Sequence, residues 1–540
     1  MNRRTLILGA VVLSMPFVGC QSADKLLDVT SPTTVSDETF WTQENDAVLS
    51  LNGTYSALPD WFEIIGHDGL TDNGAVNRQF DSRYVFSDGT NDPISAYGRE
   101  RWQRWFPGVA RANILLGNID RIPAGQIDPV RKERYIAEAK FLRAVLYLQL
   151  VATYGPVPMP LTPMTDAESR QLTNATTTQL YDQSIKDLDE AAAVLPVSYT
   201  GNDVGRATKW AAVSYKARAA LYDGRFQMAA DAAKQVIDAN VYSLHPNYGD
   251  LFLYAGETSP ERIFTRNYAK STQAAGQNNN IFGEYGPYTN SASATVVPIR
   301  QLVDAYPMRD GLPITTSPLY VPKAWTPEDT LSYTSNRDPR LEFTILYPGA
   351  PWDGGVFDSR PRGISSKPEA IDLQNAQVSV TGFNIRKYID VTDKLDRGNG
   401  GLDIILMRYA DVLLMYAEAM FELGQGADPT ALAAFNLVRQ RPSVNLPPVA
   451  VLTQDLIRNE RRVELAFEGL RLFDIRRWQI AEQVMPVTAV CGIDYINAAA
   501  ETVRACQPAS ARQFPPRAYL WAIPQVEIDL NPNLQQNPGY

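Results

Sequence analysis

The chain has 540 residues, of which 45% are hydrophobic and 20% charged, as in an ordinary folded protein with a large core. Its net charge of -10 argues against the basic surface that nucleic acid binding needs, so we expect no nucleic acid partner. The chain has only two histidines, His67 and His245, in unrelated surroundings, which argues against a zinc protease and most histidine-based acid–base catalysis. It has no phosphate loop and no Gly-x-Ser-x-Gly motif, and we expect no metal ion or cofactor.

The first 20 residues have the features of a secretion signal. Arg3 and Arg4 precede an apolar run over 6–13, which is too short to cross a bilayer, and the segment ends at Gly19 and Cys20. A cysteine in this place resembles a bacterial lipobox, whose cysteine is acylated and begins the mature chain. We therefore expect lipidation at Cys20 and attachment to a membrane through the lipid, with an ordinary signal and an incidental cysteine as the alternative.

Helical periodicity organises the N-terminal half of the mature chain, which we assign to 21–255. An extended segment is expected first, and an irregular excursion over 60–98 interrupts the helices. The helix at 129–154 is apolar almost all round, which predicts deep burial, and Gly155 with Pro156 ends it. The predicted helices cover 44–58, 99–119, 129–154 and 178–195.

Two helical hairpins are predicted far apart in the sequence, at 207–239 and 409–441. In each, two amphipathic helices rich in alanine flank a turn that contains glycine, Gly224 in the first and Gly424 in the second, and the spacing resembles a tetratricopeptide unit. Because such pairs need stacked neighbours to complete a core, we expect a single superhelical scaffold.

The C-terminal region, 256–540, is predicted to be loop-rich over 256–400, helical over 401–480 and extended in its tail. Short strands are expected at 296–299, 343–347 and 382–388. The fold class is therefore mainly α, with a tetratricopeptide-like scaffold, a loop-rich and strand-poor subdomain packed on it, and both regions in one compact unit.

The run NERRVELAFEGLRLFDIRRW at 459–478 predicts one amphipathic helix with a charged flank. Glu468 with Arg471 and Asp474 with Arg477 form pairs of opposite charge at a spacing of three. Gly469 costs about 1 kcal/mol inside a helix relative to alanine, so we expect a neighbouring segment to pack closely there.

Five further landmarks accompany this run: the lipobox, the opening helix, Tyr-Gly-Pro-Val-Pro at 154–158, the hairpin at 409–441 and the ending at 519–540. Together they resemble the SusD/RagB family of outer-membrane nutrient-binding lipoproteins. The resemblance implies a SusD-like fold and a non-catalytic protein, lipid-anchored at the outer membrane and facing the cell exterior, which captures oligosaccharides and passes them to a SusC-type TonB-dependent transporter.

Three alternatives stay open beside this interpretation. Some members of the family bind peptides instead of glycans. A surface-anchored glycoside hydrolase is the second alternative, because sixty acidic residues always contain possible carboxylate pairs. The third is a helical-repeat adaptor that binds only another protein.

A glycan site needs an exposed ring face and nearby polar groups. Two irregular stretches, 60–98 and 278–288, contain both, and a turn rich in Pro and Gly around Trp352 is a third possibility. The predicted ligand-binding residues are Trp61, Asp72, Asn73, Arg83, Tyr84, Tyr97, Tyr285, Tyr288 and Trp352, with Arg78 and Asn279 beside them.

Two cysteines remain after Cys20. In an oxidising compartment Cys491 and Cys506 could form a disulfide, worth about 3 kcal/mol of stability. Two free thiols are the alternative.

Overall fold

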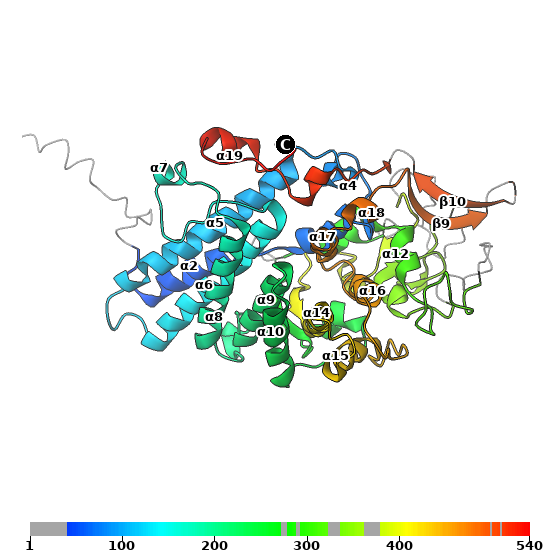
Figure 1. The fold of residues 1–540 in the computed structure, drawn as a ribbon, viewed down its shortest axis with the longest axis horizontal. Coiled ribbons are helices and arrows are strands. Elements are labelled where there is room, and N and C mark those ends of the chain that lie inside the picture. Colours follow the sequence, from blue (N-terminus) through cyan, green and yellow to red (C-terminus); the bar gives the residue numbers. More distant parts are fainter. Residues whose placement is uncertain are drawn as a thin grey trace, which may run out of the picture.

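The protein is described by a computed structural model that is mainly helical, as predicted (Figure 1). The predicted signal segment, Cys20 and Tyr288 lie outside the residues that it describes. These residues are 40–271, 278–287, 292–321, 335–360, 379–496, 499, 501–507 and 510–540.

Long helices pack side by side in the N-terminal half (Figure 1): α2 at Glu44–Tyr55, α5 at Ala96–Asn118, α6 at Pro129–Tyr154 and α8 at Thr177–Val194. Helix α6 has the predicted bounds. The Asp128 side chain accepts a hydrogen bond from the first turn, and Gly155, with φ +71°, ends the helix. Its residues from Phe141 onward are nearly all buried, as their apolar character predicts.

The two predicted hairpins are present and stacked. The first consists of α9, Lys209–Tyr222, and α10, Phe226–Asp238; the second consists of α14, Tyr409–Glu422, and α15, Pro429–Arg439. Helix α10 packs on α14, and the Arg218 guanidinium donates to Asp411 Oδ2 at 2.7 Å, so that α9 is also tied to α14. Figure 1 shows α6, α8, α9, α10, α14 and α15 following one another as a single scaffold, each packed on the next.

Strands are short and occur as antiparallel pairs among the described residues. Two pairs, β1 with β3 and β2 with β8, join segments that are far apart in the sequence. A buried apolar core includes residues from Trp41 to Leu534. The pairs are β1 Gly74–Val76 with β3 Val296–Pro298, β2 Arg262–Arg266 with β8 Ile404–Arg408, β4 Ile345–Leu346 with β7 Asn384–Ile385, β5 Pro351–Trp352 with β6 Gly355–Val356, and β9 Val490–Ile496 with β10 Thr502–Gln507. Short helices complete this part: α11 Ile281–Tyr285, α12 Arg300–Ala305, α13 Arg340–Thr344 and α18 Ala481–Val484.

The disulfide expected between Cys491 and Cys506 is present. The two residues face each other in register across the β9–β10 pair, with their Cα atoms 4.1 Å apart. Pairing in a hairpin accounts for the bond, because opposed residues of adjacent strands bring their Cβ atoms within disulfide range.

The prediction of one helix over 459–478 is wrong. Helix α16, Gln454–Glu464, stops, and α17, Arg471–Arg477, begins after a turn in which Phe467 and Gly469 have φ angles of 61° and 74°. A Cβ atom on Gly469 would lie 3.0 Å from the carbonyl oxygen of Ile64. The close neighbour that the glycine predicts is therefore Ile64. Its close approach requires the helix to break between Glu464 and Arg471.

The excursion at 60–98 is also more ordered than predicted. It contains α3, Trp61–Gly66, a 3-10 turn at His67–Leu70, and α4, Tyr84–Asp88, and much of it is buried. These elements are too short to show a periodicity, and they are held by contacts with the segment at 462–471 rather than by their own pattern.

The C-terminal tail packs back on the body, as expected, but without the predicted strand. It forms a 3-10 turn at Pro516–Tyr519 and helix α19, Gln525–Leu530. The Trp521 backbone N–H donates to Thr153 O at 2.9 Å, and the Asn537 amide donates to Tyr154 O at 2.7 Å. The tail thereby closes over the end of α6.

Candidate functional site

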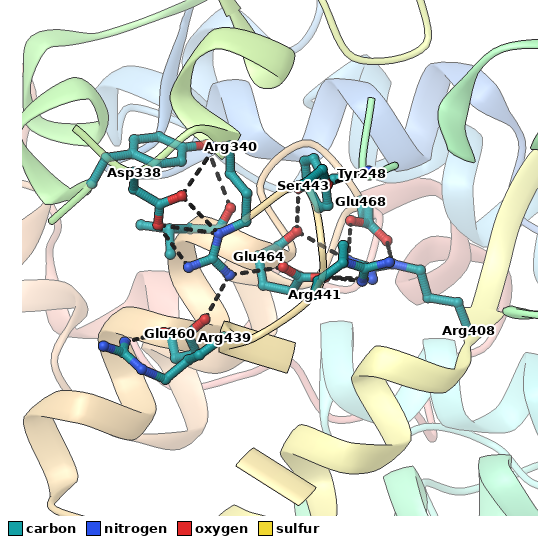
Figure 2. Close-up of polar contacts among 12 residues, drawn as sticks. Tyr248, Asp338, Arg340, Arg408, Arg439, Arg441, Ser443, Glu460, Glu464 and Glu468 are labelled. Carbon is teal, nitrogen blue, oxygen red and sulfur yellow. Dashed lines mark hydrogen bonds and ion pairs between the residues drawn. The ribbon is translucent and has the colours of Figure 1, made fainter. Parts of the chain in front are cut away.

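Charged side chains from α16 lie buried at the centre of the C-terminal region (Figure 2). The Glu464 carboxylate accepts hydrogen bonds from Arg340 and Arg408, each at 2.8 Å, and from Arg441 at 2.9 Å. Burial alone would raise its pKa, but the three guanidinium groups outweigh burial and hold the pKa of Glu464 well below its usual range. Glu464 is therefore an ionised structural group.

Further ion pairs extend this cluster, which we call the Glu464 network. It joins strands β2 and β8, helix α13 and the hairpin α14–α15 to α16, so that segments distant in sequence share one set of charges. Its carboxylates are bound to guanidinium or ammonium groups and do not face an open cleft. This arrangement suits a structural role and not an acid–base one. The pairs are Glu261 with Arg408 and Arg441, Glu460 with Arg340 and Arg439, Glu468 with Arg408 and Lys387, and Asp338 with Arg340.

A second clamp forms around Asp72, one of the predicted ligand residues. Its two carboxylate oxygens accept from Arg471 at 2.8 Å each, and Arg462 lies 3.0 Å away. Burial raises the pKa of Asp72, but Arg462 and Arg471 together prevail and hold it at about 2. The carboxylate thus ties the 60–98 segment to α16 and α17.

Replacing Asp72 by asparagine is expected to lower the free energy of unfolding by about 2 kcal/mol at pH 7. Because the pKa of Asp72 in the folded protein, about 2, lies below its ordinary value of 3.8, this stability is present above pH 3.8 and is lost as the pH falls towards 2. Urea denaturation at several pH values measures the difference, which should shrink in acid. The exposed Asp120→Asn serves as the control, with a change below about 0.5 kcal/mol; a difference that stays constant with pH would contradict the assignment.

Most of the other predicted ligand residues are also buried. Asn73, Arg83, Tyr97 and Tyr285 have no exposed surface, and Trp352, in the β5–β6 hairpin, is 6% exposed. The expectation of an exposed ring is therefore wrong for the two tyrosines and Trp352. Asn73, Arg83 and Tyr285 have hydrogen-bond partners inside the protein, as buried polar groups generally do, whereas the buried Tyr97 hydroxyl has none among the described residues.

The two predicted stretches nevertheless meet in space. Arg83 donates to the Tyr285 hydroxyl at 2.8 Å, the rings of Trp61 and Tyr285 are 5.9 Å apart, and Arg78 donates to Ser293 O at 3.0 Å. Segments more than 200 residues apart thus form one surface. Trp61 and Tyr84 keep partial exposure there and stay candidates for ligand contact.

An exposed ring that the sequence reading missed lies on this surface. Phe80 is 84% exposed, and the guanidinium of Arg78 lies 5.8 Å from its ring centre. We call residues 78–81 with Tyr84 the Phe80 surface. Beneath it, Arg83 fixes the loop by binding Asp81 at 2.6 Å. An apolar ring between Gln79 and Asp81, in a polar run, was the available signal, because such a ring has no local core to join.

A separate groove of about 610 Å³ lies between α5, residues 158–172 and α19. Its lining is largely apolar and contains none of the predicted ligand residues. It includes Trp102, Phe106, Pro160, Met164 and Leu530. The groove offers volume, whereas the Phe80 surface offers an open ring beside charged groups.

The described part of the chain forms no cluster of three or more His, Cys, Asp or Glu side chains that could hold a metal ion. Within the same residues, no helix combines the length and hydropathy needed to cross a membrane.

Comparison with known proteins agrees with the architecture. The model of the SusD family matches residues 260–540, and a second family model, starch-binding associating with outer membrane, matches residues 45–221. SusD-like protein P25 of Formosa agariphila is 26% identical over 511 residues, which cover 89% of this chain and 91% of that protein.

Solved structures give the same relationship. A SusD-like carbohydrate-binding protein of Bacteroides fragilis superposes with a TM-score of 0.81 at 28% identity, covering 92% of this chain and all of the other. A second SusD-like protein of the same species gives a TM-score of 0.78 at 26% identity, covering 94% and 99%. The resemblance drawn from the motifs is confirmed, and the chain belongs to the SusD family, a carbohydrate-binding family that associates with the outer membrane.

Proposed function

We propose that the chain is a lipid-anchored nutrient-binding protein at the outer face of the outer membrane. It captures oligosaccharides at the Phe80 surface and passes them to a SusC-type TonB-dependent transporter. Membership of the SusD family and the carbohydrate-binding relative from Bacteroides fragilis support this proposal. Cys20 would carry the lipid, because it ends a signal segment with a lipobox-like sequence.

The observation that carries the proposal is the open ring of Phe80 beside Arg78 and Asp81. The apolar C–H face of a sugar packs on such a ring, and the neighbouring guanidinium and carboxylate bind its hydroxyl groups. Arg83 and Tyr285 hold the loop from below, so that little conformational entropy is lost on binding. Binding of this kind breaks no bond, and we propose no enzymatic activity.

Calorimetric titration of the mature chain with a panel of neutral oligosaccharides and matched peptides tests the proposal. We expect heat of binding from at least one glycan, and chromatography of the mixture should recover that glycan intact. Response to peptides alone would favour a peptide-binding protein. Release of reducing sugar would favour a hydrolase. No heat of binding from any glycan or peptide in the panel would contradict the proposal.

Phe80→Ala is expected to weaken binding of the identified glycan about tenfold, because one aromatic contact contributes about 1.5 kcal/mol. The ring is exposed, so the free energy of unfolding should change by less than about 0.5 kcal/mol. Phe80→Tyr, which keeps the ring, is the matched control and should retain binding. Equal affinities for Phe80→Ala and the parent chain would remove Phe80 from the site.

A further inference from the structure

Another concave site lies on the C-terminal region, and its lining contains none of the residues of the Phe80 surface. It has a volume of about 420 Å³ and is bounded by α16, α18 and the turn at 307–313. Four arginines and two acidic residues line it, although the whole chain carries a net charge of -10. They are Arg439, Arg458, Arg462, Arg471, Asp455 and Glu460.

The acidic groups near this pocket are shared between cations. Arg462 and Arg471 both bind the single carboxylate of Asp72, at 3.0 and 2.8 Å. Glu460 is held by Arg340 at 2.5 Å as well as by Arg439 at 2.9 Å. Two guanidinium groups on the single Asp72 carboxylate leave positive charge in excess there. Arg340 also binds Asp338 and Glu464, so Glu460 keeps charge for Arg439.

Arg458 adds a cation without a close anion. Among the described residues its side chain makes neither a hydrogen bond nor an ion pair, and its guanidinium lies 5.2 Å from the ring centre of Trp478. Burial lowers its pKa, against the opposing effect of Glu418 and Glu422. Glu418 is itself occupied by Arg477 at 2.5 Å.

Arg462 shows the same excess of positive charge. Burial lowers the pKa of Arg462 to about 10, Asp72 opposes this, and the neighbouring Arg471 lowers it further. A bound anion stabilises guanidinium groups that are buried in this way, because the anion replaces the interactions that water no longer supplies.

The turn beside the pocket leaves room for a guanidinium. Arg439 donates through Nη1 to Glu460 and through Nε to Pro447 O, while its Nη2 lies against Gly311. A Cβ atom at Gly311, whose φ is +81°, would stand 2.7 Å from Nη2. Glycine therefore keeps this side of the pocket open.

We propose that this pocket binds the oxyanion of an acidic sugar, a carboxylate or a sulfate group. The planar fork of arginine matches both anions with paired hydrogen bonds, and the volume lies in the range of small-molecule sites. Arg458 is the cation free to engage the ligand, and Arg439 lines the same pocket. The site goes beyond the proposed function, since its residues are separate from the Phe80 surface.

The test is titration of the mature chain at low ionic strength with glucuronate, inorganic sulfate and, as the neutral counterpart, glucose. We expect glucuronate or sulfate to bind and glucose not to bind. Glucuronate binding assigns a carboxylate ligand, and binding of sulfate alone assigns a sulfate ester. Failure of both anions overturns the proposal.

Variants locate the binding. Arg458→Gln should weaken binding of the anion about tenfold, because a hydrogen bond to a charged group is lost. Arg458→Lys should keep part of the affinity. Arg111→Gln, an exposed change on α5, is the control and should bind as the parent does. Phe80→Ala should leave the anion affinity unchanged, so that failure here and failure of the proposed function are distinguishable. Undiminished binding in Arg458→Gln overturns the assignment to this pocket.

Discussion

Replacing Glu464 by glutamine is expected to lower the free energy of unfolding by about 3–5 kcal/mol, because it removes one partner from a buried set of ion pairs. Arg340, Arg408 and Arg441 all donate to this carboxylate, and none of the three has an exposed side chain that could turn to water. Glutamine keeps the size but not the charge, so the three cations lose their shared anion. Guanidinium denaturation of the mature chain measures the loss.

The exposed Glu482→Gln in α18 is the matched control, and its free energy of unfolding should stay within about 0.5 kcal/mol of the parent. A loss below about 1 kcal/mol for Glu464→Gln would show that the Glu464 network contributes little to the fold. The account would then need another explanation for the burial of so many charges.

Trp521→Ala is also expected to have a large effect and to lower the free energy of unfolding by about 3–5 kcal/mol. The indole is 2% exposed and packs against the rings of Phe86, Tyr97 and Tyr154, with ring centres 4.5, 5.7 and 6.0 Å away. Removing it leaves a cavity between the tail, α4 and the end of α6. Thermal and denaturant unfolding measure the loss, and limited proteolysis should cut the tail faster.

Val526→Ala, in the same tail but 40% exposed, is the control and should change stability by less than about 1 kcal/mol. Equal resistance of Trp521→Ala and the parent chain to protease would contradict the view that the indole holds the tail on the body.

The buried charges and the open ligand surface are connected. The Asp72 clamp fixes the 60–98 segment on α16 and α17, and Arg83 then fixes the loop of Phe80 on α11 through Tyr285. A site held in this way is pre-organised, which reduces the entropic cost of binding. If the Phe80 surface binds a ligand as proposed, the charged C-terminal segment supports that recognition without touching the ligand.

The sequence predicted the long helices well, because their apolar periodicity is local. Helix α6 and the hairpins α9–α10 and α14–α15 have nearly the expected bounds, and their stacking follows from the need to bury two faces. The break after Glu464 could not be predicted in this way. The left-handed conformation of Phe467 arises where Gly469 meets Ile64, a contact about 400 residues away in sequence.

The two stretches that carry the candidate site, 60–98 and 278–288, do meet in the structure. The burial of their charged and aromatic side chains cannot be predicted from the sequence, because the partners of these side chains are distant in sequence. Asp72 is paired with Arg471, and Tyr285 with Arg83. The exposure of Phe80, by contrast, depends on tertiary packing, and its polar neighbours are the one indication of it in the sequence.

A crystal structure of the mature chain with an oligosaccharide that calorimetry has identified tests the central claim most directly. The account predicts a sugar ring within about 4.5 Å of the Phe80 ring, with its hydroxyl groups hydrogen-bonded to Arg78 or Asp81. A ligand seated in the groove between α5 and α19, with Phe80 still facing solvent, would contradict it.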